Sequence, residues 1–270
     1  MAAAFVAQHA DVPWFVNLWL NDVHDPWAPG DDALGEVMGK GSSADEDRFL
    51  ASLVKMDKTL GRLFERLRQM GEFENTLIVV TSDNGPSPLP RYYRDGHTAP
   101  GNAGDLRGRK FSLFEGGIRQ PLILSWPARA RAGYRDDRTV GHGVDLFPTF
   151  AHLAGAPLPA GADGVDLSPV LSGMPVERQA PLFWAYGKEG ALRQPNLPSQ
   201  PHDVSPRFAV RDGDWKLLAE AGGAAPQLYD LATDPRESRE VGARNPAIRD
   251  RLLARLKAWM ASLPRYRRAS

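Results

Sequence analysis

Three short apolar runs along the chain predict buried β-strands. The runs are rich in Val, Ile, Leu and aromatic residues, and turn-forming residues bound each of them: Trp14–Leu20, Thr76–Thr81 and Pro121–Trp126. Continuous apolar runs of this length are typical of strands that are covered on both faces, as in a parallel sheet. We therefore expect the three runs to be strands of one buried parallel sheet.

Helical periodicity is clearest between the first two runs. Ser43 and Glu46 have the spacing of a capping box, the apolar residues that follow recur at helical intervals, and Gly71 provides a stop. Strand, helix and strand in this order predict a right-handed parallel crossover. A second helix is expected from about Asp145 to Ala154, opened by Asp145 and closed by Gly155.

The character of the chain changes after Leu171. Residues 188–206 are rich in Pro, Gly and Gln and predict a long surface excursion. Short strand patterns and an amphipathic helix then follow: Arg207–Arg211, Trp215–Leu218, Gln227–Leu231, and a terminal helix that carries Ile248, Leu252, Leu256 and Trp259. We expect residues 1–175 to form an α/β domain and residues 176–270 a small α+β subdomain beside it.

Composition narrows the classes of function. The 270 residues balance 33 Lys and Arg against 33 Asp and Glu, so no basic surplus indicates a nucleic-acid partner. The apolar start has no Lys or Arg before Lys40, and Asp11 and Pro13 interrupt it, so neither a secretory signal nor a membrane span is expected. There is no Cys, which excludes thiolate metal sites and Cys nucleophiles within this sequence.

Polar residues follow two of the predicted strands. His24 comes shortly after the first run, and Asp83 and Asn84 come directly after the second. Parallel neighbours would bring these strand ends to one cleft. A carboxylate and an amide oxygen suit calcium or magnesium better than zinc, but such an ion needs about six oxygens, so further ligands would have to come from elsewhere.

Plainer readings of the same residues stay open at this point. Ser82–Gly85 is also good turn chemistry, a lone His after a strand is more often structural, and Lys110 has the setting of a solvated loop lysine. Arg107 and Arg109 would extend an anion-attracting surface or simply be solvated.

A series of segments along the chain resembles the sulfatase family of the alkaline phosphatase superfamily. Thr76–Gly85 resembles the family's metal-binding strand end, and Asn21–Pro26 resembles the segment that holds its active-site histidine. Leu106–Lys110 followed by Glu115–Pro121 is similar to its active-site lysine loop. Weaker likenesses continue the series: Val144–Thr149, Asp163–Ser168 and Arg211–Lys216.

The resemblance implies roles for single residues. Asp83 and Asn84 would ligate one divalent cation, calcium more readily than magnesium. His24 and Lys110 would contact the sulfate oxygens; Lys110 would stabilise the growing charge and His24 would protonate the departing alcohol. His97 is a weaker candidate for substrate binding, with an ordinary loop position as the alternative.

The resemblance also implies a fold, a substrate and a setting. The fold is a partial alkaline-phosphatase-like α/β domain, with a parallel-rich sheet flanked by helices, plus the small C-terminal α+β subdomain. The substrate would be a small-molecule or carbohydrate sulfate ester, with no nucleic acid and no membrane as partner. The sequence does not fix the compartment, although periplasmic or extracellular placement suits the full-length family.

Two parts of the family pattern have no counterpart here. The family nucleophile is a formylglycine made from the first residue of a Cys/Ser-x-Pro-x-Arg motif; Ser125–Arg129 fits formally, but it follows the third strand and comes after the lysine loop, so we reject it. The tandem acidic metal ligands are also missing, since Asp31–Asp32 and Asp136–Asp137 are expected in loops. We therefore expect this chain alone to fold poorly and to be inactive. Three explanations of the missing N-terminal portion stay open: a misassigned start, a split gene with the portion supplied by another chain as partner, and a true loss.

Two other functions stay open. The same superfamily includes phosphomonoester and phosphonate-ester hydrolases, whose tetrahedral oxyanions suit the same side chains. A degenerate, non-catalytic relative that binds anions or a partner chain is the third possibility.

Overall fold

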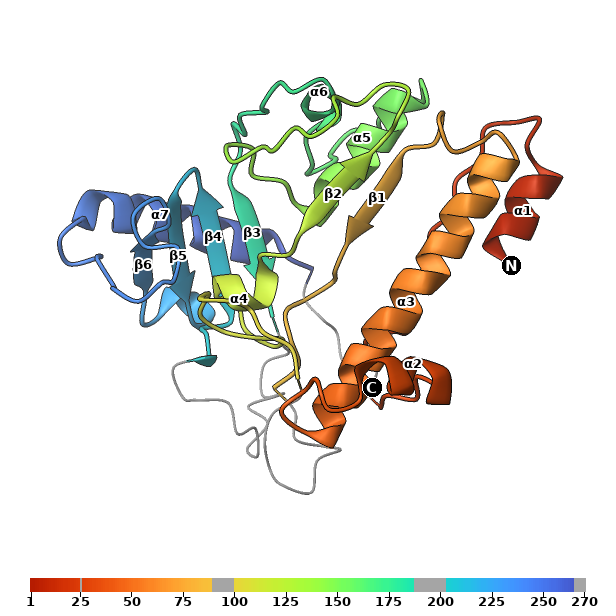
Figure 1. The fold of residues 1–270 in the computed structure, drawn as a ribbon. Helices are drawn as coiled ribbons and strands as arrows, with labels where there is room; N and C mark the ends of the chain where they lie inside the picture. The colour runs from red at the N-terminus through yellow and green to blue at the C-terminus, as the bar shows by residue number, and fades with distance from the viewer. Residues whose placement is uncertain (25, 89–99, 187–202, 265–270) are drawn as a thin grey trace, which may run out of the picture.

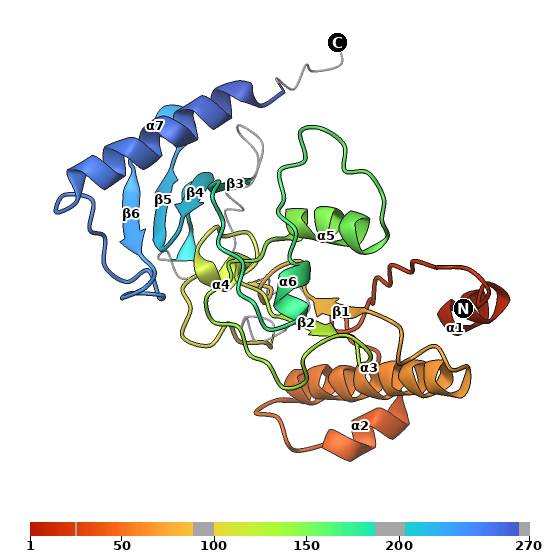
Figure 2. The same ribbon diagram turned by 90° about the horizontal axis from the view of Figure 1, so that it is seen from above.

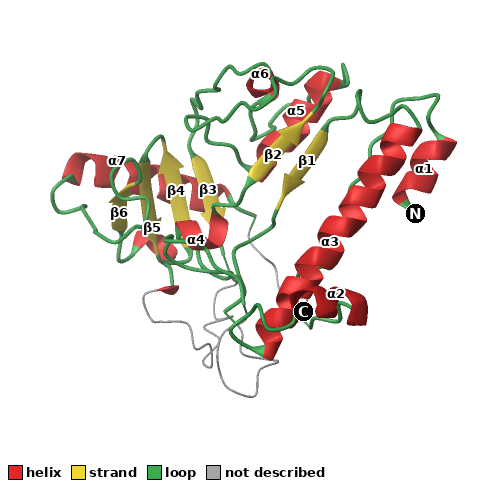
Figure 3. Cartoon of the chain, viewed as in Figure 1, coloured by secondary structure: helices red, strands yellow, loops and turns green. Residues whose placement is uncertain are grey.

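The computed structural model describes residues 1–24, 26–88, 100–186 and 203–264. The described residues form both helices and strands (Figures 1 and 3), in agreement with the expected α/β class. The helices are α1 (Ala2–Gln8), α2 (Asp31–Val37), α3 (Ala44–Gln69), α4 (Glu115–Ile118), α5 (Leu146–Leu153), α6 (Ser168–Leu171) and α7 (Pro246–Ser262). The strands are β1 (Ile78–Thr81), β2 (Leu122–Ser125), β3 (Leu182–Ala185), β4 (Phe208–Asp212), β5 (Trp215–Ala219) and β6 (Gln227–Asp230).

The described strands form two antiparallel sheets. β1 pairs with β2, with Ile78 opposite Ser125 and Thr81 opposite Leu122, and the other sheet has the order β3-β4-β5-β6. The expected parallel pairing of the second and third apolar runs is therefore wrong in this part of the chain. An apolar run reports burial but not direction, and here the loop between β1 and β2, which includes α4, returns the chain antiparallel.

The first apolar run is not a strand, which corrects the expected parallel crossover through α3. Trp14–Leu20 has no assigned secondary structure, and large side chains on it are exposed, including Phe15 (67%) and Trp19 (89%). A strand exists only where its backbone groups find a neighbouring ladder, and local apolar content cannot supply one.

The long helix α3 follows its sequence signals. The Ser43 hydroxyl accepts a hydrogen bond from the Glu46 backbone N–H (3.2 Å), and Gly71, just beyond the end, has the positive φ of a helix stop (78°). The Glu46 carboxylate caps the Ser42 N–H (2.6 Å) rather than that of Ser43. One pattern was missed: Asp31–Asp32 opens α2 instead of lying in a loop.

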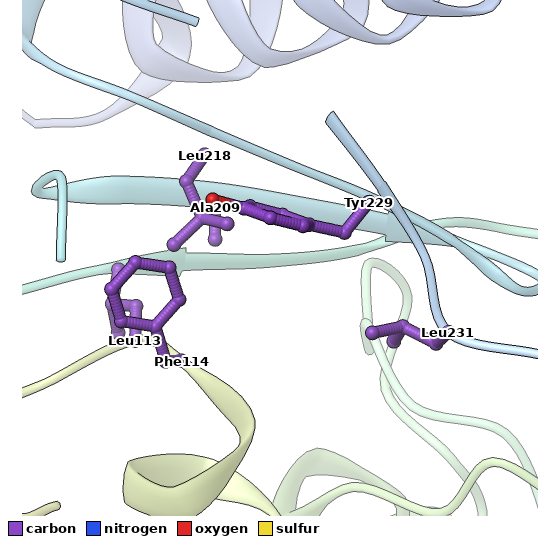
Figure 4. Packing of buried hydrophobic residues seen from close by; sticks show 6 residues of the cluster. All are labelled: Leu113, Phe114, Ala209, Leu218, Tyr229 and Leu231. Carbon is purple, nitrogen blue, oxygen red and sulfur yellow. The ribbon is translucent and has the colours of Figure 1, made fainter. Parts of the chain in front are cut away.

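The C-terminal sheet has two buried faces, as the alternation of its side chains requires. Residues of one face, including Leu217 and Leu228, pack against Leu252 and Leu256 of α7, which runs across the sheet in Figure 2. The opposite face is covered by a loop from the first half of the chain, through the cluster in Figure 4: Leu113, Phe114, Ala209, Leu218, Tyr229 and Leu231. The predicted C-terminal α+β unit is present, β3 being the strand that the sequence did not reveal; its boundary near residue 175 stays a prediction.

The second expected helix is α5, and it is preceded by a buried polar cap. The Asp145 carboxylate, 0% exposed, accepts hydrogen bonds from the backbone N–H groups of His142 (2.7 Å) and Val165 (2.8 Å) and pairs with Arg178. The His142 ring in turn accepts a hydrogen bond from the Val144 N–H (3.2 Å) and packs edge-on against Trp184. Within the described ranges no helix is long and apolar enough to cross a membrane.

The cap predicts a pH dependence of stability. Burial lowers the pKa of His142 below its usual 6.5, with Arg178 adding to the effect and Asp145 opposing it. The unfolded chain therefore binds more protons than the folded chain just below pH 6.5, so the stability that neutral His142 contributes is present above that pH and is lost as the pH falls through the folded pKa. Urea unfolding should show that His142→Asn, which keeps a cap acceptor but does not titrate, loses less stability than the wild type between pH 7 and pH 5.5. Equal losses would contradict this role.

Candidate active site

Lys110 lies on a closed loop between β1 and β2. The backbone N–H of Gly116 donates to the carbonyl of Arg107 (2.7 Å) and so joins the two ends of the loop. A Cβ on Gly116 would lie 2.3 Å from the Gly108 carbonyl oxygen, so only glycine allows this approach. Phe111, next to Lys110, has a positive φ (76°), which is a strained conformation for a bulky residue.

The Asp83–Asn84 turn is fastened to the same loop. The Gly85 N–H donates to the Gly117 carbonyl (3.0 Å), and the Lys110 N–H donates to the Pro86 carbonyl (3.0 Å). The two backbones are so close that a Cβ on Gly85 would lie 1.9 Å from the Gly116 carbonyl oxygen. The turn chemistry of Ser82–Gly85 thus has a second use, because it places the acid–amide pair beside the lysine loop.

His24 reaches this place from the N-terminal segment. Its backbone N–H closes a turn by donating to the Asn21 carbonyl (2.9 Å), and the Trp27 indole donates to the Val23 carbonyl (3.0 Å). Trp27 packs edge-on against Phe49 of α3 (5.7 Å between ring centroids). α3 therefore supports the turn that presents His24.

The structure brings His24 and Lys110 into direct contact. The Lys110 Nζ lies 3.4 Å from the His24 Nε2, although 86 residues separate them in the chain. The two nitrogens are within hydrogen-bond distance, and an ammonium can only donate. Two groups that can donate to an oxyanion thus share one exposed spot, next to the turn that carries Asp83 and Asn84.

The acid–amide pair fits a hard cation in its chemistry but not in its number of donors. Asp83 is exposed, and the Asn84 side-chain NH₂ donates to the Gly85 carbonyl (2.9 Å). Across the described ranges no group of three or more His, Cys, Asp and Glu residues could hold a metal ion. Two oxygen donors are well short of the roughly six that calcium or magnesium takes.

Of two further candidate residues, His97 and Ser125, the structure describes only Ser125. His97 and most of the 188–206 excursion lie outside the described residues. Ser125, the formal nucleophile candidate, ends β2 opposite Ile78, whereas Asp83 follows the other end of β1. Ser125 is therefore at the end of the strand pair away from the acid–amide turn, in keeping with its rejection as a nucleophile.

Arg107 is neither a free anion attractor nor a solvated side chain. Its guanidinium lies over the Phe114 ring (3.7 Å from the centroid) and donates to the Tyr229 hydroxyl (3.1 Å) and the Glu237 carbonyl (3.0 Å). Local sequence gives no sign of this role, because Tyr229 and Glu237 are more than 120 residues away.

A buried charge cluster behind the lysine loop was also missed. Lys216 of β5 is 0% exposed; its Nζ donates to the Glu115 carboxylate (2.8 Å) and lies 3.0 Å from Glu237 Oε1. Burial would raise the pKa of Glu115, but the charge and hydrogen bond of Lys216, with Arg211 and Arg119, bring that pKa below its usual value. Burial raises the pKa of Glu237 despite Lys216. One sequence feature could have indicated that Lys216 is buried: it shares a strand face with the apolar Leu218, two residues later.

Comparison with known protein families gives two overlapping matches. A family profile described as Sulfatase matches residues 1–156. A second, described as N-sulphoglucosamine sulphohydrolase, C-terminal, matches residues 108–263. Together they span nearly the whole chain.

Individual relatives and solved structures agree. Human Arylsulfatase A is 33% identical over 254 residues, which are 86% of this chain and 45% of the relative. The crystal structure of Ps i-CgsB with k-i-k-neocarrahexaose is similar with a TM-score of 0.77 and 26% identity, over 96% of this chain and 52% of that one. The Phosphonate Monoester Hydrolase of Agrobacterium radiobacter is similar with a TM-score of 0.55 and 25% identity, over 80% of this chain and 41% of that one. The chain thus spans about half the length of the relatives that it matches.

The close approach at Gly85 can be tested with a matched glycine. Gly85→Ala should lower the free energy of unfolding by about 2 kcal/mol, because its Cβ would displace the Gly116 carbonyl. Gly61→Ala, at a position in α3 with nothing within 4 Å of the new Cβ, should instead raise it by about 0.5–1 kcal/mol. Chemical denaturation of both variants checks the pair, and a neutral Gly85→Ala would show that the two loops do not touch as described.

Proposed function

The chain belongs to the sulfatase family, and on this premise we propose that it supplies the His24 and Lys110 half of an active site that hydrolyses an organic sulfate ester. The observation that carries the proposal is the 3.4 Å contact between the His24 Nε2 and the Lys110 Nζ. Both groups were singled out from separate sequence segments, and both donate to tetrahedral oxyanions when protonated.

Lys110 and His24 would have different roles toward a bound ester. The Lys110 ammonium would donate to the sulfuryl oxygens and hold them in place while negative charge develops on the departing oxygen as the S–O bond breaks. The His24 imidazole, once protonated, would donate its proton to the departing alcohol oxygen. The fastened loop and turn give these groups fixed places, so little reorganisation is needed when substrate binds.

We further propose Asp83 and Asn84 as two of the ligands of one divalent cation, calcium rather than magnesium. Their oxygens have the right chemistry, and calcium tolerates irregular coordination better. When bound, such a cation supplies Lewis-acid stabilisation of the sulfuryl group. The remaining ligands and the formylglycine nucleophile of the family would come from the part of the family domain that this chain does not match.

The partner that we propose is therefore a polypeptide with the other half of the family domain, joined to this chain or separate. Two observations support it: relatives are about twice as long as the matched region, and apolar side chains lie exposed on residues 14–20 and on the strand pair, among them Trp19 (89%) and Ile123 (57%). Exposed apolar surface of this kind marks an interaction site or an aggregation liability.

For the substrate we propose a carbohydrate sulfate ester. The support is a similar solved structure that is described in complex with a carbohydrate, k-i-k-neocarrahexaose. The similarity to a phosphonate monoester hydrolase keeps a phosphorus ester as the second candidate, since Lys110 and His24 suit either oxyanion. Comparing sulfate and phosphonate esters on the completed enzyme would decide between them.

Sulfate binding tests the paired site directly. Titrating the chain with sodium sulfate at constant ionic strength should shift the NMR signals of His24 and Lys110. Lys110→Met and His24→Gln should each weaken binding about tenfold or more, because each removes a donor to the same anion. Lys58→Met, which removes a lysine that pairs with Glu36 on α2, is the control and should bind sulfate as the wild type does. Equal binding by all four proteins would contradict the site.

The same proposal predicts a negative result in an activity assay. The purified 270-residue chain should not hydrolyse 4-nitrophenyl sulfate with or without calcium, because it has no Cys and its formal Ser motif lies at the wrong end of the strand pair. Metal-dependent turnover by this chain, abolished in Ser125→Ala, would overturn the assignment of the nucleophile to the other half.

A further inference from the structure

The buried charge cluster joins the C-terminal sheet to the lysine loop. Lys216 and Leu218 lie on the same face of β5, two residues apart, and Leu218 packs in the cluster that contains Leu113 and Phe114 of the loop (Figure 4). The Lys216 ammonium therefore points toward the loop and away from α7. Its two carboxylate partners, Glu115 and Glu237, come from the end of the loop and from the segment after β6.

Glu237 is the point where both ends of the loop are held. At one end, the Arg107 guanidinium donates to the Glu237 backbone carbonyl (3.0 Å). At the other end, the Glu115 backbone N–H donates to Glu237 Oε2 (2.6 Å). Lys110 lies between these ends, and its own N–H is bonded to Pro86.

Lys216 is the base that contacts both acids of the cluster. Glu115 and Glu237 are two acids, and Lys216 and Arg211 are two bases, Arg211 lying 3.7 Å from Glu115. Removing one member of a buried, paired set leaves an uncompensated charge, which must move or take up a proton. Without Lys216 the two carboxylates would repel each other, and Glu115, on the short α4, would carry the loop with it.

We propose that Lys216 is a positioning residue for Lys110: by holding Glu115 against Glu237 it fixes the loop whose apex meets His24. We call the contact of Lys216 with Glu115 and Glu237 the clamp. The inference rests on the proposed function, because it gives the clamp a role in anion binding. The C-terminal sheet then has a role beyond packing. Its residue Lys216, which does not contact the anion, fixes the position of Lys110, which does.

The experiment compares two destabilising changes on opposite faces of the same sheet. Lys216→Met removes the clamp, and Leu252→Ala removes a buried side chain from the α7 face, which does not contact the loop. Both are studied in dilute solution at a temperature at which each is folded. The readouts are the sulfate dissociation constant and amide hydrogen exchange across residues 107–117.

Lys216→Met should weaken sulfate binding at least tenfold and speed exchange of residues 107–117, while α7 stays protected. Leu252→Ala should lower the melting temperature and leave sulfate binding within twofold of the wild type. Adding Glu237→Gln to Lys216→Met removes the surplus carboxylate and should restore part of the affinity, a rescue that a purely structural role does not predict. If Lys216→Met does not fold, Lys216→Met with Glu237→Gln takes its place in the same comparison with Leu252→Ala.

The two proposals fail in different ways. If the wild type and Lys110→Met do not bind sulfate, the proposed function fails, and faster exchange of residues 107–117 in Lys216→Met alone still supports the clamp. If Lys216→Met binds sulfate as well as the wild type, or if its loop exchanges no faster than that of Leu252→Ala, the clamp is wrong.

Discussion

The rest of the site depends on one buried interaction, the contact of Lys216 with Glu115 and Glu237. Burying a lysine is costly unless its charge is paired, and here the pairing partners are the very residues that close the loop around Lys110. The C-terminal sheet thus supports the lysine loop in addition to packing against α7. Phe114, 0% exposed, adds apolar contact to the same junction.

Three distant parts of the chain meet at the lysine loop. The turn after β1 is bonded to the lysine loop through Gly85 and Pro86, and the N-terminal turn brings His24 to Lys110. The end of the 188–206 excursion joins them, since the Asp203 carboxylate accepts from the Gly108 N–H (3.1 Å) and the Ser205 hydroxyl from the Leu113 N–H (2.7 Å). Glycines at the closest approaches make this convergence possible.

The sequence predicted well those features of secondary structure that neighbouring residues determine. The cap at Ser43, the stop at Gly71 and the strands on either side of the Gly213 turn are set by neighbouring residues, and the structure has them where the sequence places them. Strand direction and pairing are set by distant partners, and there the sequence misled: Trp14–Leu20 has no ladder, and β1 and β2 run antiparallel. The pairing of His24 with Lys110 came from the resemblance to a family, because no periodicity links residues so far apart. The roles of Arg107 and Lys216 needed the packing of the C-terminal sheet.

The family and the α/β class are established, and the proposed chemistry of the chain rests on the contact between the His24 imidazole and the Lys110 ammonium. The most direct test is a crystal structure of the chain, alone or with the other half of the family domain, grown with sulfate. The account predicts a sulfate within hydrogen-bond distance of both the His24 Nε2 and the Lys110 Nζ, beside the Asp83–Asn84 turn. A structure in which these two side chains lie on separate surfaces, with sulfate at neither, would contradict it.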